Sequence, residues 1–148
     1  MIGAIAPESS ATGHVAPGRE GGYPSAPLPA TRMAQVLSES QCLVVLCTAP
    51  DDAVAESLAR TLVAERLAAC VNRLPGLVSN YRWEGRVEED AEVLLLVKST
   101  AEQLDALCAR ITALHPYELP EILAVPVLGG LDTYLAWVRE SVAGPSSS

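Results

Sequence analysis

The chain has 148 residues, which is enough for one domain with a sizeable core. It is 49% hydrophobic but contains no Phe and only 4% aromatic residues, so its core must be built from Leu, Val, Ile and Ala. The formal net charge is −8 at pH 7 and Lys and Arg form no cluster, which argues against nucleic acid and anionic membranes as partners.

Residues 1–40 differ in composition from the rest of the chain. Residues 1–32 in particular are rich in Pro and Gly, contain few large apolar residues and show no period of 2 or 3.6. Such a segment buries too little surface to offset its chain entropy, so we predict a disordered tail over 1–40, in which His14 has no specific role and Met33 offers an alternative start. It also lacks the basic start and apolar run of a secretory signal. We expect a folded domain over 41–142 and a disordered C-terminus over 143–148.

The folded region alternates strand and helix patterns. In chain order these predict a strand over 41–48, a helix over 50–67, a strand over 68–74 that continues extended over 77–83, a strand over 86–98, a helix over 99–114, a strand over 121–128 and a helix over 131–141. Pro75-Gly76 interrupts the second strand, and Glu84-Gly85 turns a hairpin. The spacing of Ser99 and Glu102 is that of a capping box. The order β-α-β-β-α-β plus a terminal helix predicts an α+β, ferredoxin-like split sandwich.

Two predicted strands are too apolar for a sheet that is covered on one face only. Val93–Val97 is apolar at every position, and Cys42–Cys47 nearly so. Two helices can cover one face of the sheet. Leaving several Leu and Val side chains of the other face exposed to water would cost several kcal/mol, at ~25 cal/mol per Å² of apolar surface. We therefore expect a second copy of the chain to cover that face, in an obligate homo-oligomer.

Residues 114–121, with the sequence Leu-His-Pro-Tyr-Glu-Leu-Pro-Glu, predict a rigid loop. Each proline favours an extended conformation for the residue before it, here His115 and Leu119. Together with Cys47 in residues 46–51, the loop offers a thiol and an imidazole, which soft and borderline metals prefer as ligands. The alternatives are that Cys47 is a core residue and that His115 is a structural residue bonded to a carboxylate.

Other side chains are candidates for a cleft or a subunit interface. Tyr81 and Trp83 alternate onto the same face of the predicted hairpin, as aromatic interface anchors do. Lys98 ends an apolar strand and faces either a cleft or solvent. The full set of cleft and interface candidates is Cys70, Tyr81, Trp83, Lys98, Tyr117, Glu118, Glu121 and Trp137.

The four cysteines give an expectation about the compartment. The sequence has no CxxC motif and no export signal, which suits a reducing cytoplasm. Cys108 lies on the apolar stripe of the predicted second helix, so core packing is its expected role. Asp51 and Asp52 are best explained as charges at a helix N-terminus.

Several blocks of the sequence resemble the CutA family of divalent-cation tolerance proteins. The match runs from about Cys42 to Val142, with the blocks in order and correctly spaced. The blocks are residues 44–51, 67–72, 79–85, 115–121 and 134–137. The resemblance implies a ferredoxin-like fold of the kind seen in PII signalling proteins, a tight cytoplasmic homotrimer, copper binding and a part in tolerance to divalent metals.

The metal ligands implied by this resemblance are only partly present. Family members would bind copper with the cysteine of the first block, here Cys47, and with two adjacent histidines. The second of these is His115, but Leu114 occupies the first position. We expect one copper ion per subunit, held more weakly for want of one ligand. Because a thiol must lose its proton to bind, binding should also weaken at acid pH.

The sequence leaves two other function classes open. An enzyme would need a nucleophile or an acid–base pair such as His115 with Glu118 or Glu121, but no catalytic motif supports one, so we expect no enzyme. The alternative is a PII-like sensor that binds a small metabolite in clefts between subunits. The expected partners are other copies of the chain and metal ions.

Overall fold

The computed structural model of the protein describes residues 38 and 40–144. The predictions for the rest of the N-terminal tail, His14 and Met33 included, and for residues 145–148 lie outside the described residues. The elements are β1 (Cys42–Ala49), α2 (Asp52–Ala64), β2 (Cys70–Trp83), β3 (Arg86–Thr100), the 3-10 turn η1 (Ala101–Gln103), α3 (Leu104–Leu114), β4 (Leu123–Pro126) and α4 (Asp132–Val142). This confirms the predicted order of strands and helices.

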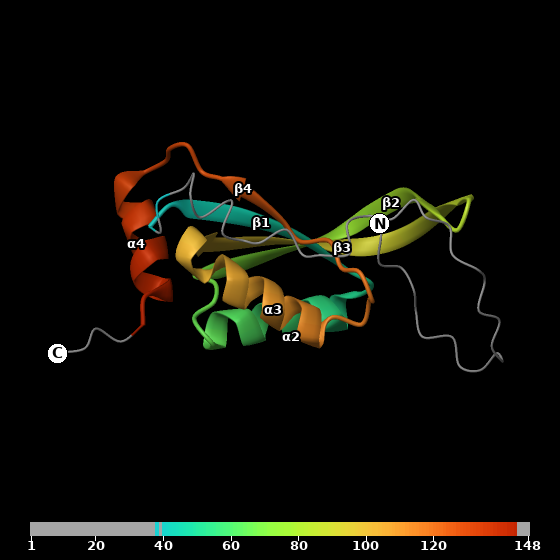
Figure 1. The fold of residues 1–148 in the computed structure, drawn as a ribbon, viewed down its shortest axis with the longest axis horizontal. Helices are drawn as coiled ribbons and strands as arrows, with labels where there is room; N and C mark the ends of the chain where they lie inside the picture. The colour runs from blue at the N-terminus through green and yellow to red at the C-terminus, as the bar shows by residue number, and fades with distance from the viewer. Residues whose placement is uncertain (1–37, 39, 145–148) are drawn as a thin grey trace, which may run out of the picture.

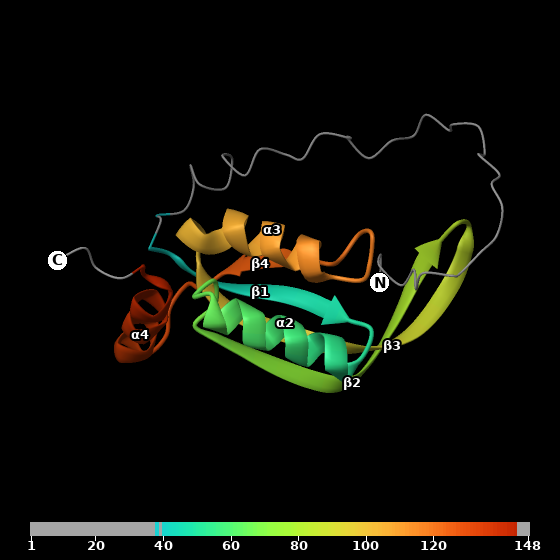
Figure 2. The same ribbon diagram turned by 90° about the horizontal axis from the view of Figure 1, so that it is seen from below.

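The four strands form one antiparallel sheet in the order β2-β3-β1-β4. Helices α2 and α3 lie side by side on one face of the sheet, and α4 packs at one end (Figures 1 and 2). At the other end the hairpin of β2 and β3 extends beyond the two helices. The fold is therefore α+β, with both crossover helices on one face of the sheet.

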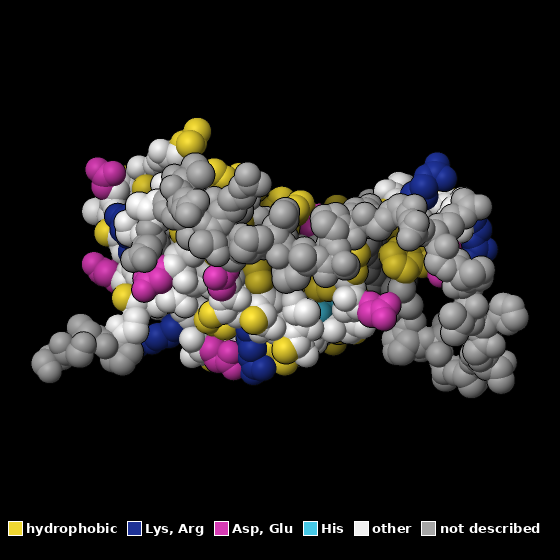
Figure 3. Space-filling view, viewed as in Figure 1, with side chains coloured by type: hydrophobic (Ala, Val, Ile, Leu, Met, Phe, Trp, Pro, Cys, Tyr) yellow, Lys and Arg dark blue, Asp and Glu magenta, His cyan; other side chains and the backbone are white. Residues whose placement is uncertain are grey.

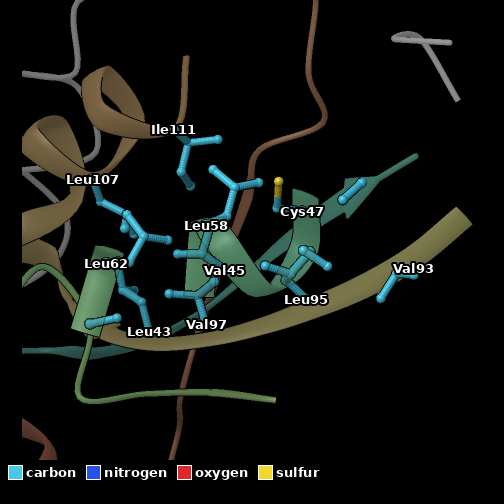
Figure 4. Packing of buried hydrophobic residues seen from close by; sticks show 13 residues of the cluster. Leu43, Val45, Cys47, Leu58, Leu62, Val93, Leu95, Val97, Leu107 and Ile111 are labelled. Atoms are coloured by element: carbon cyan, nitrogen blue, oxygen red, sulfur yellow. The ribbon is translucent and has the colours of Figure 1, made fainter. Parts of the chain in front are cut away.

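The main core lies between the sheet and these two helices. It is built from alternate residues of the two central strands and from the inner sides of the helices (Figure 4). Its largest members are Leu43, Val45, Leu58, Leu62, Leu95, Val97, Leu107 and Ile111. On α2 the buried side chains are Ala55, Leu58 and Leu62.

Helix α2 begins as predicted but ends three residues early. The Asp51 carboxylate caps its N-terminus by accepting a hydrogen bond from the Val54 N–H at 2.8 Å. At the other end, Leu67 N–H bonds to the Leu62 carbonyl and Arg66 N–H to the Val63 carbonyl, which closes the helix at Ala64. Arg66 has a φ of 59°, a conformation that usually belongs to glycine at this position.

The sequence predicted that Pro75-Gly76 would break the second strand, and this prediction is wrong. β2 runs on to Trp83, and the register with β3 shifts between Leu74 and Leu77, so the two residues form a bulge. Gly76 supplies the positive φ of 86° that the bulge requires. The predicted turn at Glu84-Gly85 is confirmed, with positive φ at both residues.

The predicted capping box at Ser99 is wrong. The Ser99 hydroxyl donates to the Leu67 carbonyl at 2.7 Å, so it ties β3 to the segment after α2. β3 therefore continues to Thr100, and α3 begins at Leu104 after the 3-10 turn. Cys108, expected in the core, is only half-buried on α3.

The sheet face away from α2 and α3, which we call the open face, is apolar. Half-buried side chains from the two central strands form its middle, namely Val44, Leu46, Leu94 and Leu96. Exposed side chains from the edge strands continue it, with Leu74 at 42%, Leu123 at 54% and Val125 at 48% exposure. Helix α4 covers only one end, where Val138 and Val142 pack on Cys42 and Ala69. The predicted uncovered apolar face is present.

The described surface shows no extended basic area on the side seen in Figure 3. Lys and Arg side chains occur there in small separate groups, interspersed with Asp and Glu. Within residues 38 and 40–144, no helix is long and apolar enough to cross a membrane.

Candidate functional site

Cys47 lies on the helix-covered face of β1. It is opposite Leu95 of β3 and only 1% exposed, and Figure 4 shows its side chain among those of the core. The thiol donates a long, weak hydrogen bond to the Thr48 carbonyl, with Sγ···O at 3.7 Å. Burial, together with the charges of the Glu121 and Glu92 carboxylates, raises the pKa of Cys47 to about 12. The thiol is therefore protonated at neutral pH.

His115 follows the last residue of α3 and is 8% exposed. Its backbone is extended, with φ −75° and ψ 136°, as the following proline predicted. Nε2 lies 2.7 Å from the Thr48 carbonyl oxygen, and Nδ1 accepts the Tyr117 N–H at 3.1 Å. A carbonyl only accepts, so Nε2 carries the proton. Burial lowers the pKa of His115, against the opposing effects of the Thr48 hydrogen bond and Glu92, so the ring is neutral at pH 7.

The two predicted metal ligands thus contact the same backbone oxygen. Cys47 Sγ–H and His115 Nε2–H both donate to the same oxygen, the carbonyl of Thr48. The donor types suit a soft cation, but each now holds a proton where a metal would bind. Leu114 is 38% exposed at the end of α3, while His115 is buried. The position of the absent histidine is therefore much closer to solvent than His115 is.

Tyr117 and Glu121 lie in the same region, while Glu118 is exposed. The Tyr117 ring centroid is 4.7 Å from that of His115, and burial raises the pKa of Tyr117 to about 12, with Glu92 adding to the effect. Burial, and then the charge of Glu92, also raise the pKa of Glu121. These two candidates form the surroundings of His115, and Glu118 does not.

Sequence reasoning missed Glu92. This carboxylate is 3% exposed and acts on the protonation of Cys47, His115, Tyr117 and Glu121. In the sequence it ends an acidic run that looks like a solvated strand. The one available signal was its position next to Val93, where the buried part of β3 begins.

The other cleft candidates lie in three further places. Tyr81 and Trp83 are half-buried on one face of the hairpin, where the Tyr81 hydroxyl donates to the Asp90 carboxylate. Cys70 and Lys98 face each other on the open face. Trp137 lies on α4, 44% exposed, with its ring 5.5 Å from that of Tyr134. A single copy of the chain does not gather these residues into one site.

A metal centre of three protein ligands is not present in the described part of the chain. Within residues 38 and 40–144, no three His, Cys, Asp or Glu side chains are grouped so that they could hold a metal ion. The site therefore consists of the thiol–imidazole pair of Cys47 and His115, enclosed by Tyr117, Glu121 and Glu92.

Known proteins resemble the chain over this whole domain. The family model described as CutA1 divalent ion tolerance protein matches residues 43–141. The divalent-cation tolerance protein CutA of Thermus thermophilus is 55% identical over 98 residues, which cover 66% of this chain and 95% of that protein. The crystal structure of CutA from Xylella fastidiosa is 47% identical with a TM-score of 0.69, covering 70% of this chain and 99% of that one. The structure of the periplasmic divalent cation tolerance protein CutA of Archaeoglobus fulgidus has a TM-score of 0.67 at 35% identity. The match covers 69% of this chain and 99% of that chain. The chain therefore belongs to the CutA1 family of divalent ion tolerance proteins.

Proposed function

We propose that the protein acts in tolerance to divalent metals as a homotrimer, and that each subunit can hold one copper ion between Cys47 and His115. The observation that carries the metal part is the shared acceptor. The Cys47 thiol and the His115 imidazole lie 3.7 Å and 2.7 Å from one carbonyl oxygen, so one soft cation would replace both hydrogen bonds once the two side chains adjust. Cu(I) suits this pair because it accepts low coordination and soft sulfur.

The same geometry makes this site weak. Cys47 must lose a proton from a thiol whose pKa burial has raised to about 12. His115 must move its proton from Nε2 to Nδ1, which ends the hydrogen bond that Tyr117 N–H donates to Nδ1. Within residues 38 and 40–144 no third ligand is grouped with the pair to offset these costs, and the adjacent position holds the partly exposed Leu114. Zn(II), which usually takes four ligands, fits less well than Cu(I).

The metal proposal is tested by titrating reduced, metal-free protein with Cu(I) in competition with a calibrated chelator. We expect one equivalent per chain, lost in Cys47→Ala and weakened in His115→Ala, with Cys70→Ala as the matched control that binds normally. Unchanged binding in Cys47→Ala and His115→Ala would remove this pair as the site.

The assembly proposal is supported by the open face. Its exposed Leu74, Leu123 and Val125 and its half-buried centre would be costly to leave in water. The strand order and the helices on one face fit a ferredoxin-like, PII-like subunit, and the family resemblance sets the expected number of copies at three. Light scattering should give about three times the chain mass of 15.6 kDa, and a monomer would contradict the proposal.

We also place the protein in the cytoplasm. All four cysteines, at positions 42, 47, 70 and 108, are free thiols, which suits a reducing compartment. The relative from Archaeoglobus fulgidus is called periplasmic, so the compartment needs its own test. Cell fractionation should recover the protein with cytoplasmic markers, and recovery with periplasmic markers would overturn the assignment.

A further inference from the structure

Lys98 is the single lysine of the 148 residues, and every other basic side chain is an arginine. It lies on β3, directly opposite Cys70 of β2, and both side chains belong to the open face. Lys98 Nζ is 3.7 Å from Cys70 Sγ and donates a hydrogen bond to the Asn72 side-chain oxygen. A primary amine can act as a nucleophile once it loses its proton, whereas a guanidinium stays protonated.

The backbone holds this pair in register. Directly opposed residues of an antiparallel pair have Cβ atoms about 4.5–5.5 Å apart. The Ala69 N–H donates to the Lys98 carbonyl at 2.8 Å, which ties the start of β2 to β3 beside the pair. A covalent bond between the two side-chain ends would therefore need movement of the long lysine side chain alone.

Cys70 differs from the other three cysteines in its surroundings. Cys42 and Cys47 are 4% and 1% exposed, while Cys70 and Cys108 are half-buried. Cys108 lies near the Asp105 carboxylate, whose charge disfavours a thiolate. Cys70 instead has an amine within contact distance of its sulfur. It alone combines partial exposure with a nitrogen nucleophile.

We propose that Cys70 and Lys98 form a redox-sensitive modification site, which hydrogen peroxide converts to a covalent sulfur–nitrogen bond. The Cys70 thiolate attacks one peroxide oxygen, the O–O bond breaks, and sulfenic acid and hydroxide result. The unprotonated Lys98 amine then attacks sulfur, the S–N bond forms, and the S–O bond breaks. The leaving hydroxide takes the amine proton as water. Sulfur loses two electrons, and one peroxide is reduced to two waters.

This step leaves a defined product. The thiol and the amine together lose two hydrogen atoms, and an added thiol reductant restores both groups as it becomes a disulfide. The inference does not rest on the proposed metal site. Cys70 is half-buried in one chain, and copies that cover the open face need leave only a water-sized path to it, because peroxide is hardly larger than water.

The test treats the full chain, reduced and freed of metal by a chelator, with graded hydrogen peroxide at mildly alkaline pH. Trypsin then separates residues 67–73, which contain Cys70, from residues 87–98, which end at Lys98. Because trypsin cannot cut after a linked lysine, the expected product joins 67–73 to 87–110, lighter by two hydrogens than the sum of the two peptides. A thiol reductant should restore the separate peptides.

Matched variants distinguish this bond from general oxidation. Lys98→Arg keeps the positive charge and Cys70→Ser keeps the size, and both should lose the linked peptide entirely. Cys108→Ser, which removes the other half-buried thiol, should form as much of it as the unmodified protein. Oxidation of Cys70 to sulfinic acid with no link to Lys98, or absence of any change at Cys70, would overturn the proposal. The tryptic peptide masses of the unmodified protein test the proposal even if a variant fails to fold.

Discussion

The two faces of the sheet each place a thiol beside a nitrogen, and they give these pairs opposite properties. On the helix-covered face, Cys47 and His115 are 1% and 8% exposed, and both donate to the Thr48 carbonyl. On the open face, Cys70 and Lys98 are half-buried and contact each other directly. The covered pair is closed to solutes and protonated, while the open pair is partly exposed in a single subunit.

The difference shows that side-chain alternation decides the chemistry of a cysteine in this fold. Successive residues of a strand point to opposite faces, so Val97 enters the core and Lys98 does not. The covered face removes water from a thiol and raises its pKa, which prevents reaction unless a metal replaces the proton. Four experiments can break or sharpen this contrast.

The largest effect should come from neighbouring leucines on the two faces. Leu95→Ala removes a fully buried side chain from the core and should lower the free energy of unfolding by about 2–5 kcal/mol without changing the assembly. Leu96→Asp places a charge on the open face and should separate the copies. Denaturant unfolding and light scattering measure the two effects, with Val87→Asp on the exposed hairpin as the control. An intact assembly in Leu96→Asp would show that the open face is not an interface.

The next effect should be a difference in thiol reactivity. A pKa of about 12 instead of 9.0 leaves Cys47 with about a thousandfold less thiolate at pH 8, and burial slows access further. In the native protein, iodoacetamide should therefore modify Cys70 at least about a hundredfold faster than Cys47, as followed by peptide mass spectrometry. The two rates should become equal in urea. Equal rates in the native protein would refute the contrast between the faces.

A smaller effect concerns acid stability. Because burial lowers the pKa of His115, the unfolded chain takes up its proton more readily than the folded one. This contribution to stability should be complete above the ordinary histidine pKa of about 6.5 and decrease as pH falls below it. Urea unfolding at pH 7 and pH 5 should show a smaller decrease in His115→Gln than in the unmodified protein. His14→Gln is the matched control, and an equal decrease in all three proteins would contradict the prediction.

The smallest effect is expected from Leu114→His, which supplies the missing third ligand, a second imidazole. Because Leu114 is 38% exposed, a histidine there would reach the pair only from the solvent side. We expect Cu(I) affinity to rise by no more than about tenfold, or ~1.4 kcal/mol, in chelator competition. Leu114→Gln controls for the change in polarity. Unchanged affinity would show that the position lies outside the site.

Much of the fold was predictable because the signals are local. Continuous apolar runs identified β1 and β3, the Glu84-Gly85 pair identified the turn, and the excess of apolar residues identified the open face. The errors arose from distant partners. Ser99 looks like a helix cap in the sequence, but the carbonyl of Leu67 accepts its hydroxyl. Arg66 ends α2 in a conformation for which the sequence offers no glycine.

The candidate site was predictable in its side chains but not in its arrangement. Cys47 and His115 were identified from their types and from the family resemblance. Their common partner is a backbone carbonyl, which every residue carries and no sequence pattern marks. Cys70 and Lys98 were likewise named separately, and only the strand register, which the bulge at Pro75-Gly76 helps to set, shows that they face each other.

The most direct test of this account is the pH dependence of Cu(I) affinity, measured by chelator competition between pH 6.5 and 8.5. Binding releases the Cys47 proton, while His115 only moves its own from one ring nitrogen to the other. Affinity should therefore rise about tenfold per pH unit and be abolished in Cys47→Ala. Affinity that does not change with pH, or that survives in Cys47→Ala, would contradict the account of a buried, protonated thiol as the copper ligand.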